Sequence, residues 1–260
     1  PAGEQRQLDL AAEVRQRFRV ADLTGADGGG DLYRLIREAQ EDQRELESLV
    51  VDVGDDVLVW KLPTFAVEQR LVRDVVRRAR GRKALVLDLR GNGGGPVEVL
   101  LSLLGLLHRE DVAVATQHER VRQVPLVARG AGEGAFTGQL VVLVDSRSAS
   151  AAEVLARVVQ LTGRGVVLGD RTAGAVMRAR YRQLGTGTET AVFYGVSVTD
   201  ADVVMPDGGR LEVVGVEPDE LVLPRAADLA AGEDPVLARA LALAGISLSA
   251  AEAGALLRQR

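Results

Sequence analysis

The sequence predicts an α/β fold, and two stretches that share one order of features carry this prediction. Residues 84–89 and 140–144 are continuous apolar runs, as expected of strands buried on both faces. Each run ends in a polar or glycine-rich loop that leads into a segment with apolar residues at helical spacing. A third buried run, residues 166–168, follows the second helix. The chain therefore contains repeated strand–loop–helix units.

Composition limits the class of protein. The chain has 260 residues, 47% of them hydrophobic and 27% charged, so it can bury the core of one or two globular domains. A net charge of −5 argues against a nucleic-acid-binding surface, and the absence of cysteine excludes disulfides and thiolate metal sites. No apolar run is long enough to span a membrane, and no signal peptide is visible. Because the chain begins at Pro1 rather than Met, a targeting segment could precede it.

Three regions are predicted along the chain. Residues 1–47 form a helical arm, with two helical patterns joined by the glycine-rich residues 24–30. We expect a packing or dimer contact from this arm rather than a chemical role. Residues 48–228 form the α/β core, and residues 229–260 form helices that pack on it.

The elements of the core follow from local patterns. A hairpin is predicted about residues 54–56, and a helix with its arginines outward over residues 66–80. Pro96 opens a helix that ends near residue 107. The remaining predictions are strands at 112–115 and 121–127, a glycine-rich loop at 130–138, a hairpin of 177–184 with 191–198, a turn at 205–209, residues 211–216 closing the sheet region, and helices beginning at Asp234 and Ser249.

Ser150, where a polar turn meets a helix, has two interpretations. Glu153 follows three residues later, so the pair has the spacing of a helix capping box. Alternatively, Ser150 is a nucleophile on an elbow, with backbone N–H groups of the helix start stabilising an oxyanion. The same tetrapeptide, Ser-Ala-Ala-Glu, recurs at Ser249, where no buried strand leads into it. Locally, the tetrapeptide predicts only a helix start.

The glycine loop, residues 91–95, also has more than one interpretation. The dinucleotide-binding pattern fails because its third glycine falls on Pro96, and no Gly-Lys-Ser/Thr is present. A tight turn with close helix–strand packing is one alternative. The other is an anion- or oxyanion-binding loop at a helix N-terminus.

Taken together, these stretches resemble a known family. LVLDLRGNGGG is followed in order by VVLVDSRSASAAEVLARVVQ, GRGVVLGDRTAG and GVEPD. This order, over roughly residues 57–223, resembles the C-terminal processing (tail-specific) serine peptidases, whose relatives include the tricorn core and the interphotoreceptor retinoid-binding protein repeats. The resemblance implies a ClpP/crotonase-like fold of repeated strand–strand–helix units. It also implies a serine endopeptidase that acts on unstructured or C-terminal polypeptide segments.

The resemblance assigns roles to single residues. The family's Ser-Ala-Ser-Ala-Ser-Glu motif falls on residues 148–153, which implies that Ser150 is the nucleophile. The oxyanion donors would be the N–H of Ala151 and a glycine-loop N–H, that of Gly94 or Gly93.

The sequence departs from the family at the general base. Processing peptidases place a lysine directly after Thr-x-Gly, and this chain has Ala175 there. The acidic residue that some members carry on the nucleophile's helix falls on Leu161. The Ser–Lys dyad is therefore absent, and arginine cannot replace the lysine because it stays protonated.

Few other residues could serve as the base. Of 32 basic residues only Lys61 and Lys83 are lysines, and His108 and His118 are the two histidines. Lys61 is either a strand-end lysine that reaches water or a buried base with a lowered pKa. His108 is either a cation at a helix C-terminus or the base, since tricorn-like members use a histidine from elsewhere in the chain. Further polar candidates are Tyr181, Asp145, Asp170 and Glu212.

Three functions remain under comparison. The favoured one is a serine endopeptidase; the others are a domain that binds polypeptide tails without turnover, which Ala175 favours, and a crotonase-like acyl-CoA enzyme, which the serine elbow argues against. The expected partner is a polypeptide substrate or its C-terminal tail, with no nucleic acid and no metal or organic cofactor. The resemblance further implies a homo-oligomer and an extracytoplasmic location, periplasmic or secreted.

Overall fold

The computed structural model describes residues 47–186 and 192–258, so the arm predicted over residues 1–47 lies outside the described residues except for its last residue. The strands are β1 (Leu49–Val53), β2 (Val57–Lys61), β3 (Ala84–Asp88), β4 (Val112–Glu119), β5 (Gln123–Ala128), β6 (Gln139–Val144), β7 (Val166–Gly169), β8 (Arg178–Thr186), β9 (Val192–Val204) and β10 (Glu220–Leu221). The helices are α2 (Gln69–Ala79), α3 (Val97–Leu107), α4 (Ala151–Leu161), α5 (Ala226–Ala231), α6 (Pro235–Leu243) and α7 (Ala250–Leu256), with a 3₁₀ turn, η1 (Gly132–Gly134).

The larger sheet has the strand order β1-β2-β3-β6-β7-β10. Strands β2 to β10 of this order are parallel, and β1 is antiparallel to β2 at one edge. Strands β3 and β6 are neighbours near the centre, paired from Ala84 with Gln139 to Asp88 with Leu143. Because both strands point the same way, the glycine loop that follows β3 and the serine turn that follows β6 emerge side by side.

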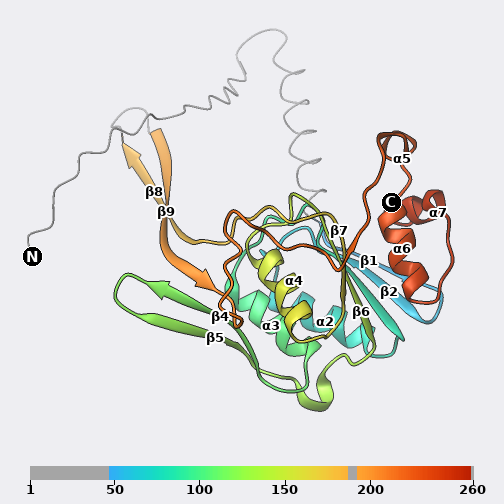
Figure 1. Cartoon of the computed structure of the whole chain (residues 1–260), viewed down its shortest axis with the longest axis horizontal. Coiled ribbons are helices and arrows are strands. Elements are labelled where there is room, and N and C mark those ends of the chain that lie inside the picture. The colour runs from blue at the N-terminus through green and yellow to red at the C-terminus, as the bar shows by residue number, and fades with distance from the viewer. Residues whose placement is uncertain (1–46, 187–191, 259–260) are drawn as a thin grey trace, which may run out of the picture. The chain divides into compact units, whose positions relative to one another are not determined.

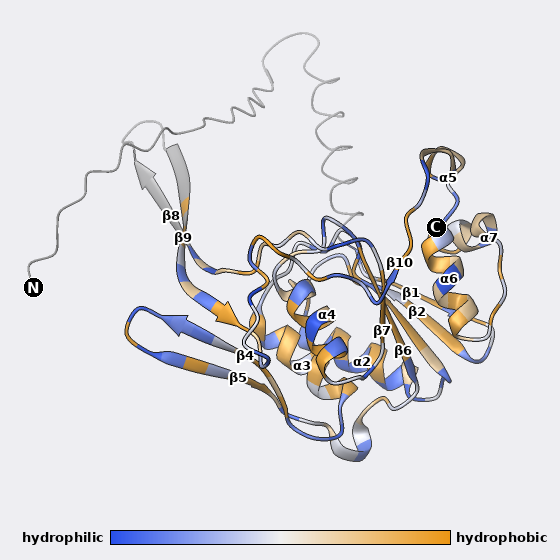
Figure 2. Cartoon of the chain, viewed as in Figure 1, coloured by the Kyte–Doolittle hydropathy of each residue, from blue (hydrophilic) through white to orange (hydrophobic). Residues whose placement is uncertain are grey.

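Helices cover both faces of this sheet (Figure 1). Leu58, Leu85 and Val142 face a core shared with α2, α3 and α4. The alternating residues, such as Val59 and Val86, face a second core shared with α6 and α7. Burial on both faces explains why these strands are apolar throughout, as Figure 2 shows.

A second sheet, with strand order β5-β4-β9-β8, is built from two hairpins that reach out from the core (Figure 1). Strand β9 joins the hairpins by pairing with β4 from Thr116–Val204 to Glu119–Ala201. In Figure 2 the outer part of the β4–β5 hairpin is more hydrophilic than the strands of the larger sheet. Among the described residues no helix is long and apolar enough to cross a membrane.

Most predicted elements are confirmed, and four predictions need correction. The strands expected to end at residues 115 and 198 continue to Glu119 and Val204. The helix expected from residue 66 begins at Gln69. Residues 211–216 form a turn rather than a closing strand, because Val213 has a φ of 66° and cannot continue an extended ladder. The short β10 closes the sheet instead.

Candidate active site

Ser150 lies between β6 and α4 in a backbone conformation that residues other than glycine rarely adopt. Its φ is 56° and its ψ is −117°, a strain of about 1–3 kcal/mol. The Ser150 side chain makes no cap hydrogen bond at the start of α4. The helix start that the tetrapeptide predicts is therefore present, but the hydroxyl is left available for another partner.

Contacts from three segments hold Ser150 in this conformation. Its N–H donates to the Ala175 carbonyl at 3.0 Å and to Oε2 of Glu153 at 2.9 Å. On its other side Gly94 packs directly against it, since a Cβ added to Gly94 would lie 2.6 Å from the Ser150 Cβ. Only glycine fits at position 94, where φ is also 95°.

Asn92 organises the glycine loop from inside the protein. The side chain is fully buried, and its Nδ2 donates to the Leu62 carbonyl at 2.7 Å. Its Oδ1 accepts the Gly94 N–H at 2.7 Å, and its carbonyl accepts the Ala149 N–H at 2.8 Å. The Asn92 side chain thus ties the glycine loop to the residue after β2, and its main-chain carbonyl ties the loop to the serine turn.

Several backbone N–H groups near Ser150 are without an acceptor in the described part of the chain, and two of them line its pocket at the glycine loop and at the start of α4. One belongs to Ala151, the first residue of α4, where the helix dipole favours negative charge. The other belongs to Gly95, which lines the same pocket as Ser150 and Ala151. The Gly94 N–H, in contrast, is already donated to Asn92.

Glu153 joins the serine turn to the loop of residues 172–175. This carboxylate is fully buried on α4. Its Oε1 accepts the Thr172 hydroxyl at 2.6 Å and the Gly174 N–H at 2.7 Å. Its Oε2 accepts the Ala175 N–H at 2.9 Å as well as the Ser150 N–H. Four donors therefore converge on one side chain, which compensates the desolvation of its charge.

A pocket of about 290 Å³ opens beside Ser150. Its lining is mostly apolar and comes from α3, α4, the loop before β8 and all four strands of the second sheet: Gly95, Pro96, Val97, Leu100, Gln117, Leu126, Ser150, Ala151, Val154, Val176, Met177, Arg178, Ala179 and Val203. A peptide side chain of apolar character fits such a lining.

Among the described side chains that line this pocket, Arg178 is the one that is ionisable. Its Nε donates to Asp200 at 2.7 Å, its Nη2 lies 2.9 Å from Glu119, and its Nη1 donates to Oε1 of Gln117 at 2.9 Å. The hydrogen bond with Asp200, together with Glu119, raises the pKa of Arg178 further, so this side chain cannot accept a proton.

The structure does not bring Lys61 to Ser150. Lys61 ends β2 on the face of Val57 and Val59, which is the face covered by α6 and α7. Its Nζ lies 4.0 Å from the buried Asp88. Ser150 begins α4, which packs on the opposite face.

The structure also separates His108 from Ser150. His108 Nε2 lies 3.0 Å from Oγ1 of Thr162, the residue that ends α4, whereas Ser150 begins that helix. A helix of 11 residues is about 16 Å long. Burial lowers the pKa of His108, and the nearby Arg164 lowers it further.

The other polar candidates are placed as follows. Asp145 Oδ1 accepts the Gly91 N–H at 2.8 Å, so this carboxylate supports the glycine loop. Glu212 accepts the N–H groups of Val176 and Met177 and holds the chain after Ala175. Asp170 accepts the N–H of its neighbour Arg171, His118 lies on β4, and Tyr181 lies on β8. Among the described side chains that line the pocket beside Ser150, none is Asp145, Asp170, Glu212 or His118.

Sequence reasoning missed two positioning groups and one pocket residue. Glu153 looked like a helix cap because its spacing from Ser150 is that of a cap, and its three other donors lie on a distant loop. The role of Asn92 was missed because it lies in a glycine-rich run. An asparagine among glycines is nevertheless a signal for hydrogen bonds between its side chain and the backbone. Gln117 carried no signal, since its strand was expected to end before it.

Comparison with known proteins shows to which family the chain belongs. The model of peptidase family S41 matches residues 56–222. The chain belongs to peptidase family S41. The resemblance to C-terminal processing peptidases is thereby confirmed for a segment that includes the glycine loop, the serine turn and the loop of residues 172–175.

Individual relatives agree with this family. The chain is 32% identical over 143 residues to a carboxyl-terminal-processing protease of Synechocystis sp., a match covering 55% of this chain and 32% of that protein. It is 34% identical over 158 residues to a chloroplastic C-terminal processing peptidase of Tetradesmus obliquus, covering 60% of this chain and 32% of that one. The matches thus span about a third of the length of these relatives.

Solved structures confirm the predicted ClpP/crotonase-like fold. The photosystem II D1 C-terminal processing protease superposes with a TM-score of 0.51 and 26% identity, covering 66% of this chain and 44% of that one. The tricorn protease superposes with a TM-score of 0.51 and 19% identity, covering 84% of this chain and 19% of that one.

Proposed function

We propose that this chain is a serine endopeptidase domain that cleaves unstructured or C-terminal polypeptide segments through an acyl-enzyme on Ser150. The observation that carries the proposal is the conformation of Ser150 at the start of α4. Its strained φ of 56° removes the hydroxyl from capping and leaves it beside an apolar pocket and the Ala151 N–H. A serine that only started a helix would need no such strain.

In the proposed reaction the Ser150 hydroxyl oxygen attacks the carbonyl carbon of the scissile bond. The hydroxyl proton passes to a general base and then to the departing amine, as the C–N bond breaks and an ester forms on Ser150. Water then attacks the ester, which releases the new carboxyl end of the peptide and restores the hydroxyl.

The oxyanion of each tetrahedral intermediate needs preorganised donors. We assign one to the N–H of Ala151, because it begins α4 and has no acceptor among the described residues. The second comes from the glycine loop. Gly94 or Gly93 is the family's expectation, and a donation by Gly94 would be shared with Asn92. The Gly95 N–H, free of a described acceptor and lining the pocket, is a third donor of the same loop.

The absence of a base among the described residues that line the pocket supports a second candidate function, a domain that binds polypeptide tails without turnover. Of those described residues Arg178 alone is ionisable, and it stays protonated. Ala175, where the family resemblance places lysine, has no side chain that could take a proton. The apolar pocket and the loop around Ser150 would serve binding equally well in this case.

The test is cleavage of unfolded casein and labelling by a serine-directed phosphonate, with Ser150→Ala and Ser249→Ala compared with the unsubstituted chain. Ser249 is the matched control because it begins the same tetrapeptide. The peptidase proposal expects Ser150→Ala to lower both signals by about 10⁴-fold or more, and Ser249→Ala to leave both unchanged. Equal cleavage by all three chains would overturn the role of Ser150.

The variant Ala175→Lys distinguishes the two candidate functions. Ala175 is exposed, and its carbonyl and N–H lie in the hydrogen bonds that hold Ser150, so a longer side chain can be added next to the nucleophile. If the chain binds tails without turnover, only the lysine variant cleaves casein. If the unsubstituted chain already cleaves, its base lies elsewhere, and the binding-only function is rejected.

The cellular setting is a proposal from similarity. One relative is named as chloroplastic and another as a tail-specific protease of Haemophilus influenzae. We propose an extracytoplasmic location, a polypeptide partner and a homo-oligomer on this ground. Fractionation of the full-length protein and its mass in solution test these points.

A further inference from the structure

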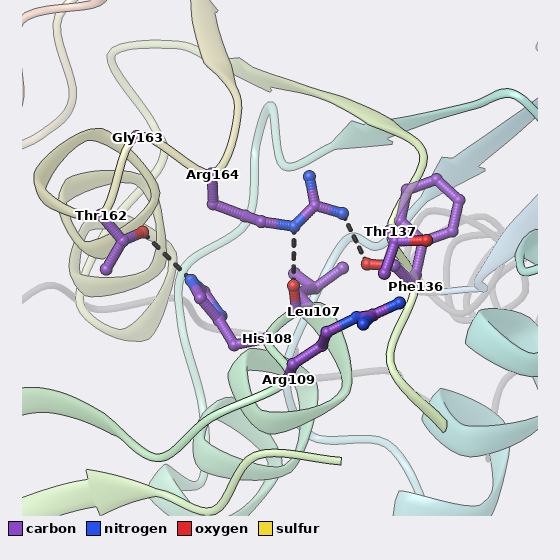
Figure 3. A pocket seen from close by; sticks show the side chains of 8 residues that line it. All are labelled: Leu107, His108, Arg109, Phe136, Thr137, Thr162, Gly163 and Arg164. Atoms are coloured by element: carbon purple, nitrogen blue, oxygen red, sulfur yellow. Dashed lines mark hydrogen bonds between the residues drawn. The ribbon is translucent and has the colours of Figure 1, made fainter. Parts of the chain in front are cut away.

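A second pocket lies at the far end of α4 from Ser150. Its volume is about 360 Å³, and Figure 3 shows the eight residues that line it: Leu107, His108, Arg109, Phe136, Thr137, Thr162, Gly163 and Arg164. Three of them can carry a positive charge and none is acidic. In a chain whose net charge is −5, this concentration of positive groups is a local property that the composition does not predict.

Arg164 is the central cation of this pocket. It is half-buried, and its Nε and Nη2 donate to the carbonyls of Leu107 at 2.6 Å and Phe136 at 2.7 Å. Its guanidinium carbon lies 5.3 Å from the centre of the Phe136 ring. Among the described residues no carboxylate pairs with Arg164, and its Nη1 donates to no described group, so part of its charge is left for a ligand.

His108 and Thr162 end α3 and α4, and their side chains contact each other at one side of the pocket. His108 Nδ1 lies 2.8 Å from the Leu104 carbonyl, and Nε2 lies 3.0 Å from the Thr162 hydroxyl. The Thr162 hydroxyl also lies 2.8 Å from the Val158 carbonyl. Carbonyls at the C-terminal ends of α3 and α4 would by themselves repel an anion. Here His108, Arg164 and Thr162 cover them with donors.

Arg109 supplies the second guanidinium group of this pocket, beside that of Arg164. Its side chain is 58% exposed and lies 3.4 Å from Glu133, a residue that is 90% exposed and does not line the pocket. In Figure 3, Arg109 and Arg164 extend from two different elements toward Phe136 and Thr137. The two arginines and the Thr137 hydroxyl therefore present donors from different sides of one cavity.

We propose that this pocket is a binding site for a phosphate-class oxyanion, held by Arg164 and Arg109 with the hydroxyl of Thr137. A guanidinium fork matches the paired oxygens of phosphate, and each hydrogen bond to such an oxygen is charge-assisted. None of the described residues that line the pocket is acidic, so a dianion inside it meets no carboxylate of the lining, and Glu133 pairs with Arg109 from outside the cavity. The site is separate from Ser150 and does not rest on the proposed peptidase activity.

The test uses inorganic phosphate as the probe and nuclear magnetic resonance of the His108 ring as the readout. Phosphate and glycerol phosphate are titrated separately at constant ionic strength, with sodium chloride as the balancing salt. The variants are Arg109→Ala, in which an exposed side chain is removed, and Arg164→Gln. Arg70→Ala is the matched control, because it removes an arginine on α2 that is 81% exposed and is not among the residues that line this cavity.

The proposal expects saturable shifts of the His108 signals with phosphate and none with chloride. Arg109→Ala and Arg164→Gln should each weaken binding by at least about tenfold, and Arg70→Ala should not. A bound dianion should also raise the pKa of His108. Tighter binding of glycerol phosphate would identify a phosphate monoester as the ligand, and tighter binding of inorganic phosphate the free ion. Shifts that chloride reproduces, or that survive in Arg109→Ala, would overturn the proposal.

Discussion

The tetrapeptide Ser-Ala-Ala-Glu begins two helices of this chain, and its two copies differ in the conformation of the serine and in the contacts of its hydroxyl. At Ser249 the backbone has the usual extended conformation of a cap, with φ −68° and ψ 160°. The Ser249 hydroxyl accepts the Glu252 N–H at 3.2 Å. At Ser150 φ is 56°, and the hydroxyl makes no such bond. The Ser249 hydroxyl therefore caps its helix, whereas the Ser150 hydroxyl does not cap α4.

The two glutamates differ in the same way. Glu252 is exposed and bonds only to Ser249, through its N–H at 2.8 Å and its hydroxyl at 2.7 Å. Glu153 is fully buried and accepts hydrogen bonds from Thr172, Gly174 and Ala175 besides Ser150. Glu252 therefore acts only within its own helix start, whereas Glu153 connects the start of α4 to the loop of residues 172–175.

The surroundings of the tetrapeptide, rather than its four residues, produce this difference. A buried strand, β6, leads into Ser150, and Gly94 of the neighbouring loop presses on it. The loop of residues 172–175 then supplies donors for Glu153 and an acceptor for the Ser150 N–H. The strain at Ser150 persists because these contacts determine its conformation from several sides.

The largest effect is expected from removing the two glutamates. Glu153→Ala removes the acceptor of two buried donors, the Thr172 hydroxyl and the Gly174 N–H, and of two part-buried N–H groups, and we expect the free energy of unfolding to fall by about 4 kcal/mol. Glu252→Ala should cost only a small fraction of this, because its partners can bond to water. Denaturant titration of both variants provides the measurement. Similar losses at the two positions would mean that burial of Glu153 does not matter.

Gly94→Ala tests whether contact with the glycine loop creates the reactive serine. The added methyl would lie 2.6 Å from the Ser150 Cβ, at a φ of 95° that disfavours any side chain. We expect phosphonate labelling to fall by about 10²-fold or more, as when an oxyanion site is disturbed. Gly81→Ala is the control, because its methyl would meet nothing within 4 Å. Equal labelling of both variants would contradict the model.

These contrasts show which parts of the fold and of the candidate site could be predicted from the sequence. The strands β3 and β6, the helices that follow them and the caps of α6 and α7 follow from hydrophobic period and cap spacing, which are local properties. Ser150 and the glycine loop could be brought together only through the order of several motifs that resemble one family. The tetrapeptide alone predicts the same structure at Ser249.

What the sequence could not supply depends on contacts between distant segments. The four donors to Glu153 span residues 150–175. Lys61 has the alternation of a buried strand residue, yet the face on which it lies is set by the packing of α6 and α7, which no local pattern encodes. The same holds for Val213, whose φ of 66° converts an apolar run into a turn.

Replacement of each serine by glycine should give effects of opposite sign. Ser150→Gly relieves the strained φ, and we expect the free energy of unfolding to rise by about 1 kcal/mol while phosphonate labelling is lost. Ser249→Gly removes a cap from an unstrained position, so it should lower the free energy of unfolding by a few tenths of a kcal/mol and leave phosphonate labelling intact. Thermal or chemical unfolding measures both. If Ser150→Gly destabilises the protein as a cap loss would, the strain assigned to Ser150 is wrong.

The smallest effect concerns the exposed copy and its pH dependence. The hydroxyl of Ser249, together with its N–H, lowers the pKa of Glu252 below the usual glutamate value. A carboxyl with a lowered folded pKa stabilises the protein above its unfolded pKa, and this stabilisation is lost as the pH falls through the folded pKa. Glu252→Gln should therefore be less stable than the unsubstituted chain at neutral pH, and the difference should vanish in acid. In a Ser249→Ala background the difference at neutral pH should shrink. Unfolding curves across this range measure it, and a pH-independent difference would show that the Ser249 bonds do not set the charge state of Glu252.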